Sequence, residues 1–501
     1  MISAETRLVR GTAITVAALV VLRLVAAAVT QLTFDEAYYW TWAKHLAGGY
    51  YDHPPMAAVV IRLGTMIAGD TEFGVRLVSI LLALPMSWAV YRAARILFDD
   101  ARIAAAATIF LNATLMASVG TTIVTPDAPL LVAASFVLYC LAKVWQTGRG
   151  VWWIAVGAAV GAGLLSKYTA LFFGAQILLW LLLVKDQRRW LASPWPYLGG
   201  ILAFAIFSPV ILWNADHEWV SFIKQLGRAR VEGMTFRYLG EMIPTQFAFA
   251  TPSVFILGVF GLYALARARA AQAAGAALIS ISVWMIFLYF VWHSLHSRVE
   301  ANWLGPIYPA FAIAAAYAAW GTIWNPREQR TMNWSRRLAL PVGVALFVVL
   351  IVQTNTGVFT GFRRDATVRS VGVGWPALAN EIEAIRLTQN ADCVLAADYG
   401  TSSWLMFYLP KGTCVVQFQQ RYRWTFMNEP NAALLKGKAL LIGPVGASPS
   451  YRAGYARVEK LAELTRKRSG VAIETYAVDL LIGAKGEVLD HALPPELGGP
   501  L

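Results

Sequence analysis

Residues 12–40 read TAITVAALVVLRLVAAAVTQLTFDEAYYW, an apolar run that is followed at once by a polar and aromatic segment. A helix that crosses a bilayer needs about 20 mostly apolar residues. The run carries Arg23 and lacks a small-residue cleavage site, so we expect a membrane span rather than a cleaved signal peptide. Ten further apolar runs follow, at roughly 74–97, 102–119, 127–145, 151–166, 168–184, 196–213, 246–266, 274–292, 304–324 and 338–356. The sequence predicts an α-helical polytopic membrane protein with about 11 transmembrane helices.

The composition agrees with this prediction. Of the 501 residues, 58% are hydrophobic and only 14% are charged, whereas a soluble domain carries about 25% charged residues. Disorder and an ordinary cytosolic enzyme are therefore excluded. The formal net charge of +13 would suggest nucleic acid as a partner, unless the basic residues have another use.

The positions of the basic residues explain the positive charge through the membrane topology. With a cytoplasmic N-terminus, the cytoplasmic loops hold fifteen Lys and Arg against five Asp and Glu, and the outer loops hold eight against eleven. Cytoplasmic loops are enriched in Lys and Arg. We therefore predict an inner-membrane protein with a cytoplasmic N-terminus, no nucleic-acid partner and a periplasmic C-terminus.

The composition changes after residue 356. We predict a transmembrane module at 1–356 and a periplasmic α/β domain at 357–501, because helix and strand patterns alternate there. The expected helices are 375–387 and 401–409, and the expected strands are 393–398, 414–418, 438–442, about 457–465 and 471–482. Cys393 and Cys414 begin two of these strands, so they are either a disulfide between parallel neighbours or two free buried thiols.

The first outer loop, about 31–73, is dense in polar and aromatic residues. Asp35 and Glu36 follow the first span, and Tyr38 and Tyr39 come next. One interpretation is a helix cap, with Thr33 or Asp35 at the start of a helix over 36–46. The other is a catalytic acid pair beside aromatic rings that stack on a sugar. Asp52 and His53 then precede a Pro pair and an amphipathic helix over about 56–68.

Other polar clusters fall on the same side of the membrane. They are Asp127, Lys167 with Tyr168, the second long outer loop at 214–245, and the segment with Arg298, Glu300 and Asn302. Ionisable groups at membrane depth are costly and mark candidate functional sites. Lys167 needs an anionic partner, either a buried carboxylate or a lipid phosphate, and Arg298 could bind a phosphate with two parallel hydrogen bonds.

Histidines raise the question of a metal. His293 with His296, or His296 with Glu300, lie at helical spacing, and together with His53 they could hold a divalent cation. The alternative is that these histidines only donate and accept hydrogen bonds. No dedicated metal motif is present in the sequence, and no cofactor is certain.

Five motifs together resemble a known family. They are Phe34-Asp35-Glu36-Ala37-Tyr38-Tyr39, Asp52-His53-Pro54-Pro55, Thr125-Pro126-Asp127, Ser166-Lys167-Tyr168 and Arg298-Val299-Glu300-Ala301-Asn302-Trp303. In order and topology they resemble lipid-phosphate-sugar-dependent glycosyltransferases of the GT-C fold. The similar members belong to the bacterial branch of the protein-mannosyltransferase superfamily, with the aminoarabinose and galacturonic acid transferases of lipid A and core.

The resemblance implies an activity and roles for residues. A sugar would move from a polyprenyl-phosphate donor, with inversion, to an extracytoplasmic acceptor such as lipid A or another envelope glycolipid. Asp35 would be the base, with Glu36 beside it, and Lys167 and Arg298 would contact the leaving phosphate. Tyr38, Tyr39, Asp52, His53, Asp127, Tyr168, Glu300 and Asn302 would contact substrate. The aminoarabinose transferases have Lys where this chain has His53, so the resemblance does not identify the sugar that is transferred.

Two other functions are consistent with parts of the sequence. Transfer to protein Ser or Thr would use the same motifs. A transporter or flippase of lipid or sugar would instead carry internal repeats and charges near mid-membrane, whereas the charges here lie at the outer ends of the spans.

Overall fold

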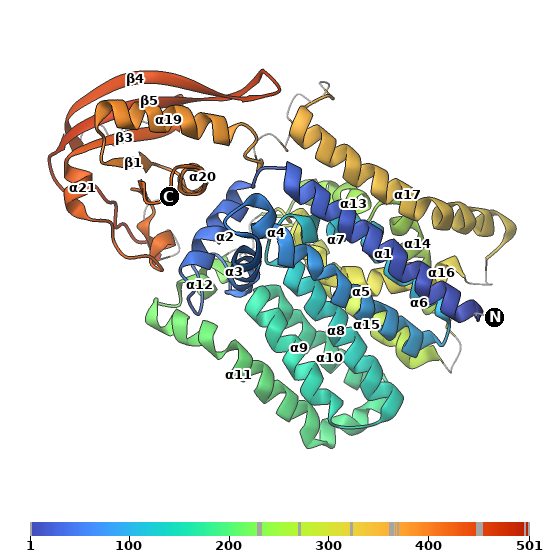
Figure 1. The fold of residues 1–501 in the computed structure, drawn as a ribbon. Coiled ribbons are helices and arrows are strands. Elements are labelled where there is room, and N and C mark those ends of the chain that lie inside the picture. Colours follow the sequence, from blue (N-terminus) through green and yellow to red (C-terminus); the bar gives the residue numbers. More distant parts are fainter. Residues whose placement is uncertain are drawn as a thin grey trace.

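The computed structural model describes residues 3–227, 233–268, 272–320, 324–359, 365, 367, 370–446, 454–494 and 497–498. A bundle of helices occupies most of the molecule, and a sheet with its helices lies at one end of it (Figure 1). The N-terminus lies at the opposite end of the bundle, whereas α2, α3 and α12 lie at the end nearest the sheet (Figure 1). Part of the predicted second outer loop, 228–232, is outside the described residues.

Helices account for every apolar run expected from the sequence. In chain order they are α1 (Ala4–Val29), α2 (Phe34–Lys44), α3 (Met56–Ala68), α4 (Glu72–Leu81), α5 (Ala83–Phe98), α6 (Ala101–Ala113), α7 (Leu115–Thr122), α8 (Asp127–Thr147), α9 (Trp152–Ser166), η1 (Tyr168–Ala170), α10 (Leu171–Leu183), η2 (Lys185–Ala192), α11 (Pro194–Asp216), α12 (Val220–Gly227), α13 (Arg237–Phe249), α14 (Pro252–Leu265), α15 (Ala273–Ser294), η4 (Ala301–Ile307), α16 (Tyr308–Ala319) and α17 (Pro326–Thr356).

The count of eleven spans is not confirmed. Among the described residues, 6 helices are long and apolar enough to cross a membrane, and up to 9 if each bent pair is one span. The pairs α6–α7 and α13–α14 bend by 58° and 106°. Thr251, with φ +65°, separates α13 from α14 just before Pro252, because the residue before a proline disfavours the helical region. The expected spans at 151–166 and 304–324 contain helices of only 15 and 12 residues.

Small residues let α9 and α11 approach closely. A Cβ on Gly157 would lie 2.1 Å from the Gly199 carbonyl oxygen, and one on Gly199 would lie 2.3 Å from the Trp153 carbonyl oxygen. Membrane helices associate through such close backbone contacts. The Gly-rich composition of α9 therefore has a packing role.

The C-terminal region forms one five-stranded sheet in the order β2-β1-β3-β5-β4. The strands β1 (Cys393–Ala396), β2 (Cys414–Gln417) and β3 (Lys438–Pro444) are parallel, and β4 (Tyr455–Arg468) and β5 (Val471–Ala484) add an antiparallel hairpin. The helices here are α19 (Trp375–Gln389), α20 (Tyr399–Tyr408), η5 (Arg421–Trp424) and α21 (Ala432–Lys436). All five strands expected from the sequence are present.

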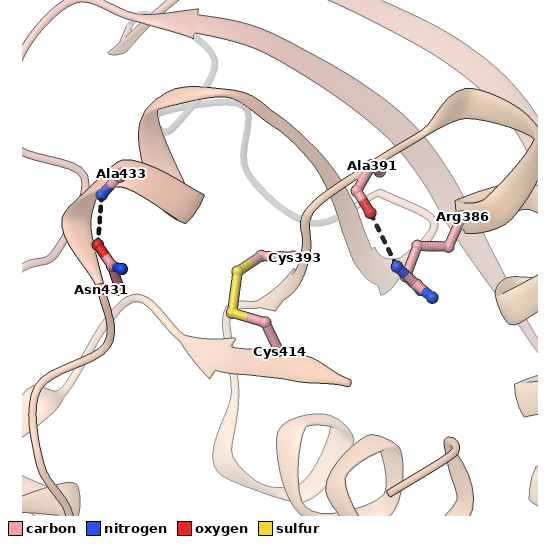
Figure 2. Close-up of a disulfide and its surroundings, with 6 residues drawn as sticks. All are labelled: Arg386, Ala391, Cys393, Cys414, Asn431 and Ala433. Carbon is pink, nitrogen blue, oxygen red and sulfur yellow. Dashed lines mark hydrogen bonds between the residues drawn. A yellow bond between two sulfur atoms is a disulfide. The ribbon is translucent and has the colours of Figure 1, made fainter. Parts of the chain in front are cut away.

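The two cysteines at the start of β1 and β2 are paired across the parallel register. Cys393 lies opposite Cys414, with a Cα–Cα distance of 4.6 Å, and the two form a disulfide. Figure 2 shows this bond beside the Arg386 guanidinium, which donates to the Ala391 carbonyl oxygen over 3.0 Å. Of the two interpretations open from the sequence, the structure has the disulfide.

We expect Cys393→Ala with Cys414→Ala to lower the free energy of unfolding of the outer domain by about 3 kcal/mol, because the bond closes a chain loop with a sequence separation of 21. Thermal unfolding with and without reductant measures the effect. Cys140→Ala, at the buried free cysteine of α8, is the control: it keeps the disulfide, so reductant should lower its stability as in the unchanged protein, whereas the double variant should not respond to reductant. A non-reducing peptide map with both thiols free would contradict the pairing.

The outer domain shares a hydrophobic core with the first outer loop. Tyr38 and Trp42 of α2 are buried in one cluster with Trp375, Trp404 and Trp424. The other face of the sheet carries a separate cluster that includes the disulfide. The Leu32 carbonyl oxygen accepts from Trp404 Nε1 over 3.0 Å. The domain is therefore fixed against the start of α2.

Candidate active site

Glu36 anchors α2 to the bundle. Its carboxylate is fully buried and accepts from Arg76 at 2.7 and 2.6 Å. It also accepts from the Thr33 amide at 2.9 Å, as part of a capping box, and from the Val124 amide at 3.0 Å. Both oxygens are occupied inside the protein. These contacts give the Glu36 carboxylate a structural role, and the expectation that it shares the catalysis stays a prediction.

Asp35, the preceding residue, points elsewhere because neighbours on a helix lie about 100° apart. Its side chain is partly exposed, and Tyr399 of α20 donates to its Oδ1 over 3.3 Å. Burial, and next the negative charge of Asp52, raises the pKa of Asp35 to about 7. A carboxylate that exchanges its proton near neutral pH in a partly enclosed site is suited to be a general base.

Asp52 is held as a charged group by two cations from distant parts of the chain. Lys224 of α12 approaches Oδ1 at 2.5 Å, and Arg423 of η5 donates to both oxygens at 2.9 and 2.8 Å. Burial alone would raise the pKa of Asp52, but the charges of Lys224 and Arg423 outweigh it and hold the pKa well below the usual range. Asp52 is therefore ionised beside Asp35.

Asp127 forms a second buried cluster at the start of α8. Lys167 donates to its Oδ1 over 2.8 Å, and Asn302 donates to its Oδ2 over 2.6 Å. Of the two partners considered for Lys167, the buried carboxylate is present. An ammonium group has three donors, and Lys167 also lines the cavity described next.

A cavity of about 400 Å³ extends from Lys167 between α10, α12 and α15. His53, Tyr168, Gln225 and His293 make its polar part, and Leu171, Phe172, Phe222, Leu226, Tyr289, Phe290 and Trp303 are among its apolar and aromatic lining residues. We call this cavity the Lys167 groove. A cation at one place and apolar walls beyond it fit a molecule with an anionic head and a hydrocarbon tail.

The two tyrosines expected to stack on a sugar are buried. Tyr38 is 1% exposed, and its hydroxyl donates to the Arg423 carbonyl oxygen over 3.1 Å. Tyr39 is 6% exposed and packs on Trp42. An open stacking wall is therefore not what these residues form. Burial, and next the negative charges of Asp35, Asp52, Tyr399 and Asp127, raises the pKa of Tyr39, so these groups lie within electrostatic range of its hydroxyl.

Known proteins share this arrangement of helices and sheet. The family model of dolichyl-phosphate-mannose-protein mannosyltransferases matches residues 52–213. The lipid A galacturonosyltransferase RgtD of Rhizobium johnstonii is 26% identical over 378 residues, 73% of this chain and 76% of that protein. The crystal structure of ArnT from Cupriavidus metallidurans, bound to undecaprenyl phosphate, has a TM-score of 0.66 at 20% identity and covers 93% of this chain and 97% of that chain. The chain therefore has the GT-C fold and is similar to these glycosyltransferases.

A second relative agrees with this family. The undecaprenyl phosphate-alpha-4-amino-4-deoxy-L-arabinose arabinosyl transferase 1 of Pseudomonas fluorescens is 31% identical over 184 residues, 36% of this chain and 31% of that protein. The segment matched by the family model contains Asp52, Asp127 and Lys167. The ion-pair clusters around Asp52 and Asp127 therefore include residues of the matched segment.

Arg298 and Glu300 lie apart from the Lys167 groove. The Arg298 side chain is 68% exposed, and its Nε lies 3.4 Å from an oxygen of Glu241 on α13. The Glu300 side chain is also exposed. Neither residue is among those that line the groove. The structure therefore does not bring Arg298 together with Lys167, and its contact with a phosphate stays a prediction. Among the described contacts of that motif, Asn302 is the residue that reaches a site carboxylate.

The metal hypothesis does not fit the described residues. Within them, no group of three or more His, Cys, Asp or Glu side chains is placed to hold a metal ion. His53 and His293 line the groove, but His296 is not among its lining residues and Glu300 is exposed. His293 is 3% exposed, and its Nε2 has no hydrogen-bond partner among the described groups. This atom is available to a bound molecule.

Four residues of the site have no signal in the sequence pattern. Arg76 lies inside an apolar run, and Lys224 lies in a loop rich in charged residues. Tyr399 and Arg423 belong to the outer domain, 364 and 371 residues away from the acids that they contact. Tyr399 and Arg423 are identified only by the tertiary contact of the outer domain with α2 and the loop after it.

Proposed function

We propose that this glycosyltransferase moves a sugar from a polyprenyl-phosphate donor to an acceptor at the outer surface of the bacterial inner membrane. The acceptor would be lipid A or another envelope glycolipid. The observation that carries the proposal is the position of Lys167 at the polar part of an apolar groove, with the buried Asp127 beside it and the acids Asp35 and Asp52 near the same Tyr39 ring. The names of RgtD and ArnT support the same donor and acceptor classes.

The donor would lie with its phosphate at Lys167 and its lipid tail along the apolar walls. Tyr168, whose hydroxyl lies 2.6 Å from Ser221 Oγ, and the ring of His53 line the polar part. Charge-assisted hydrogen bonds to phosphate are short and strong. Asp127 and Asn302 would orient the Lys167 amine rather than contact the sugar themselves.

The reaction would be a single displacement. Asp35 would take the proton of an acceptor hydroxyl as its oxygen attacks the anomeric carbon, and the bond from this carbon to the phosphate oxygen would break. The lipid phosphate leaves with the electron pair of that bond. The anomeric centre is inverted because the acceptor oxygen attacks the face opposite the leaving phosphate. Lys167 would stabilise the negative charge that develops on the leaving oxygen.

The topology proposed with this mechanism has the N-terminus in the cytoplasm and the C-terminal domain in the periplasm. The excess of Lys and Arg in the loops at the N-terminal side of the membrane supports it. The first outer loop and the outer domain lie together at one end of the bundle, away from the N-terminus (Figure 1). A disulfide in that domain also fits an oxidising compartment.

We expect Lys167→Gln to weaken the binding of undecaprenyl phosphate about tenfold to a hundredfold, because a hydrogen bond to a charged group contributes about 1.5–3 kcal/mol. Titration of the purified protein in detergent measures the dissociation constant. Arg298→Gln is the matched control and should change it less than threefold, since its side chain lies outside the groove. The reverse order of effects would contradict this placement of the phosphate.

A second candidate is transfer to protein Ser or Thr. The match to the protein mannosyltransferase family model favours it. Mass spectrometry of lipopolysaccharide and of envelope glycoproteins, from a strain that lacks the gene and from its complemented parent, separates the two. Loss of a sugar from lipopolysaccharide alone supports the glycolipid acceptor, and loss from glycoproteins alone would overturn it.

A further inference from the structure

Three separate parts of the chain meet around the acids of the first outer loop. Asp52 follows α2, Lys224 belongs to α12, and Arg423 belongs to η5 of the outer domain. Tyr399, at the start of α20 in the same domain, donates to Asp35. The outer domain therefore contributes one contact to the proposed base and one to the acid beside it.

We propose that the outer domain is a functional half of the active site, in which Tyr399 and Arg423 are positioning residues for the catalytic base Asp35. The inference rests on the proposed function, because it takes Asp35 as the base. The inference goes beyond the proposed function because it assigns the outer domain a direct part in the reaction.

The contacts of Arg423 explain why it can hold a fixed position. Its guanidinium donates to both oxygens of Asp52, and its carbon Cζ lies 5.0 Å from the ring centroid of Tyr51 and 4.9 Å from that of Tyr399. Its backbone carbonyl accepts from Tyr38. Arginine binds a carboxylate through two parallel hydrogen bonds and packs on aromatic faces, which fixes its direction.

The next residue fixes η5 in the domain. Trp424 is 1% exposed and donates from Nε1 to Gln417 Oε1 over 2.7 Å. Its ring centroid lies 5.3 Å from that of Tyr38 on α2. The position of the guanidinium is thus set by the packing of the domain on α2.

Arg423 also acts on Asp35 through charge. The groups whose charge or hydrogen bond acts on Asp35 are Glu36 on its own helix, Asp52 on the following loop, Tyr399 on α20 and Arg423 on η5. Asp35 in turn acts on Tyr39, and Lys224 on α12 neutralises Asp52. Asp52 raises the pKa of Asp35 and Arg423 lowers it. Loss of Arg423 should raise this pKa further, and loss of Asp52 should lower it.

The test measures rate against pH for Arg423→Gln, Arg423→Lys and Asp52→Asn. Each full-length variant is assayed in inner-membrane vesicles that contain the endogenous donor and acceptor lipids, with modified glycolipid quantified by mass spectrometry. Binding of undecaprenyl phosphate to the purified variants is measured in parallel. Arg386→Gln is the matched control, because Arg386 forms a comparable ion pair with Glu383 in the same domain, away from the site.

We expect Arg423→Gln to lower the plateau rate tenfold to a hundredfold and to move the acid limb of the profile to higher pH, with undecaprenyl phosphate binding changed less than threefold. Asp52→Asn should move the limb to lower pH. Arg423→Lys should recover part of the rate, since it keeps the charge and loses the second hydrogen bond. Arg386→Gln should leave rate and limb unchanged.

Two results would overturn the inference. One is a plateau rate within twofold and an unmoved acid limb in Arg423→Gln. The other is an equal loss in Arg386→Gln, which would mean that the domain matters only through stability. Both differ from failure of the proposed function, in which Asp35→Asn itself keeps a near-normal rate.

Discussion

Asp35→Asn is expected to lower the rate of sugar transfer by about 10²–10⁴-fold, the usual contribution of a positioned general base. The amide keeps the size of the side chain and can still accept from Tyr399, whose hydroxyl lies 3.3 Å from Asp35. It cannot take a proton from the acceptor. Turnover in vesicles, scored as modified glycolipid, is the measurement.

The controls for this variant are its stability and its donor binding. Because Asp35 is partly exposed and makes no ion pair among the described residues, the melting temperature and the affinity for undecaprenyl phosphate should stay close to those of the unchanged protein. Asp216→Asn, at the exposed last residue of α11, should transfer sugar normally. Near-normal turnover by Asp35→Asn would remove Asp35 from the role of base.

The assignment of Asp35 as the base predicts how the rate of sugar transfer changes with pH. A base must be deprotonated to act, and the pKa of Asp35 is raised to about 7. The rate should therefore be at its plateau above pH 7 and fall as the pH drops through 7, whereas an ordinary Asp would lose activity only near pH 4. This limb should be absent from the residual rate of Asp35→Asn.

Glu36→Ala is expected to destabilise the protein by about 3–5 kcal/mol, because removal of one partner leaves the other as an uncompensated buried charge. That partner is Arg76, whose side chain is 1% exposed. The variant would also leave the Thr33 and Val124 amides without their acceptor. We expect little folded protein at the temperature of normal expression.

The measurement is the yield of monodisperse protein and its melting temperature in detergent. Asp216→Ala, which removes an exposed carboxylate, is the matched control and should be produced normally. Should Glu36→Ala instead fold with an unchanged melting temperature and lose only its transfer activity, the catalytic role first expected for Glu36 would be supported. Substitution of the two adjacent acids is thus expected to have different effects: loss of Asp35 lowers the transfer rate, and loss of Glu36 lowers the stability.

Features with a local cause could be predicted from the sequence. The Pro pair at 54–55 and the apolar period after it gave the helix α3 with its observed bounds, Met56–Ala68. Short β-branched runs predicted the strands of the sheet, and Thr33 was one of two caps considered for α2. The acid at Asp35 was found through a motif whose residues are contiguous.

Features set by tertiary contacts could not be predicted in this way. The aromatic residues of α2 have the composition of a sugar-binding wall, but the outer domain covers Tyr38. The packing of a distant domain on an aromatic ring cannot be predicted from the local sequence. Arg423 lies in a segment with no periodicity, so nothing marked it as the partner of Asp52. The number of spans is not confirmed, because length and composition do not say whether a bent pair of helices such as α13 and α14 crosses the membrane once.

The contact between Asp52 and Arg423 joins residues 371 positions apart. At a synthesis rate of about 5–20 residues per second, the arginine emerges roughly 20–70 s after the aspartate. In the topology proposed above, Asp52 lacks this partner until the outer domain has crossed the membrane. The site is therefore completed late in synthesis, once the segment that carries Arg423 has packed on α2.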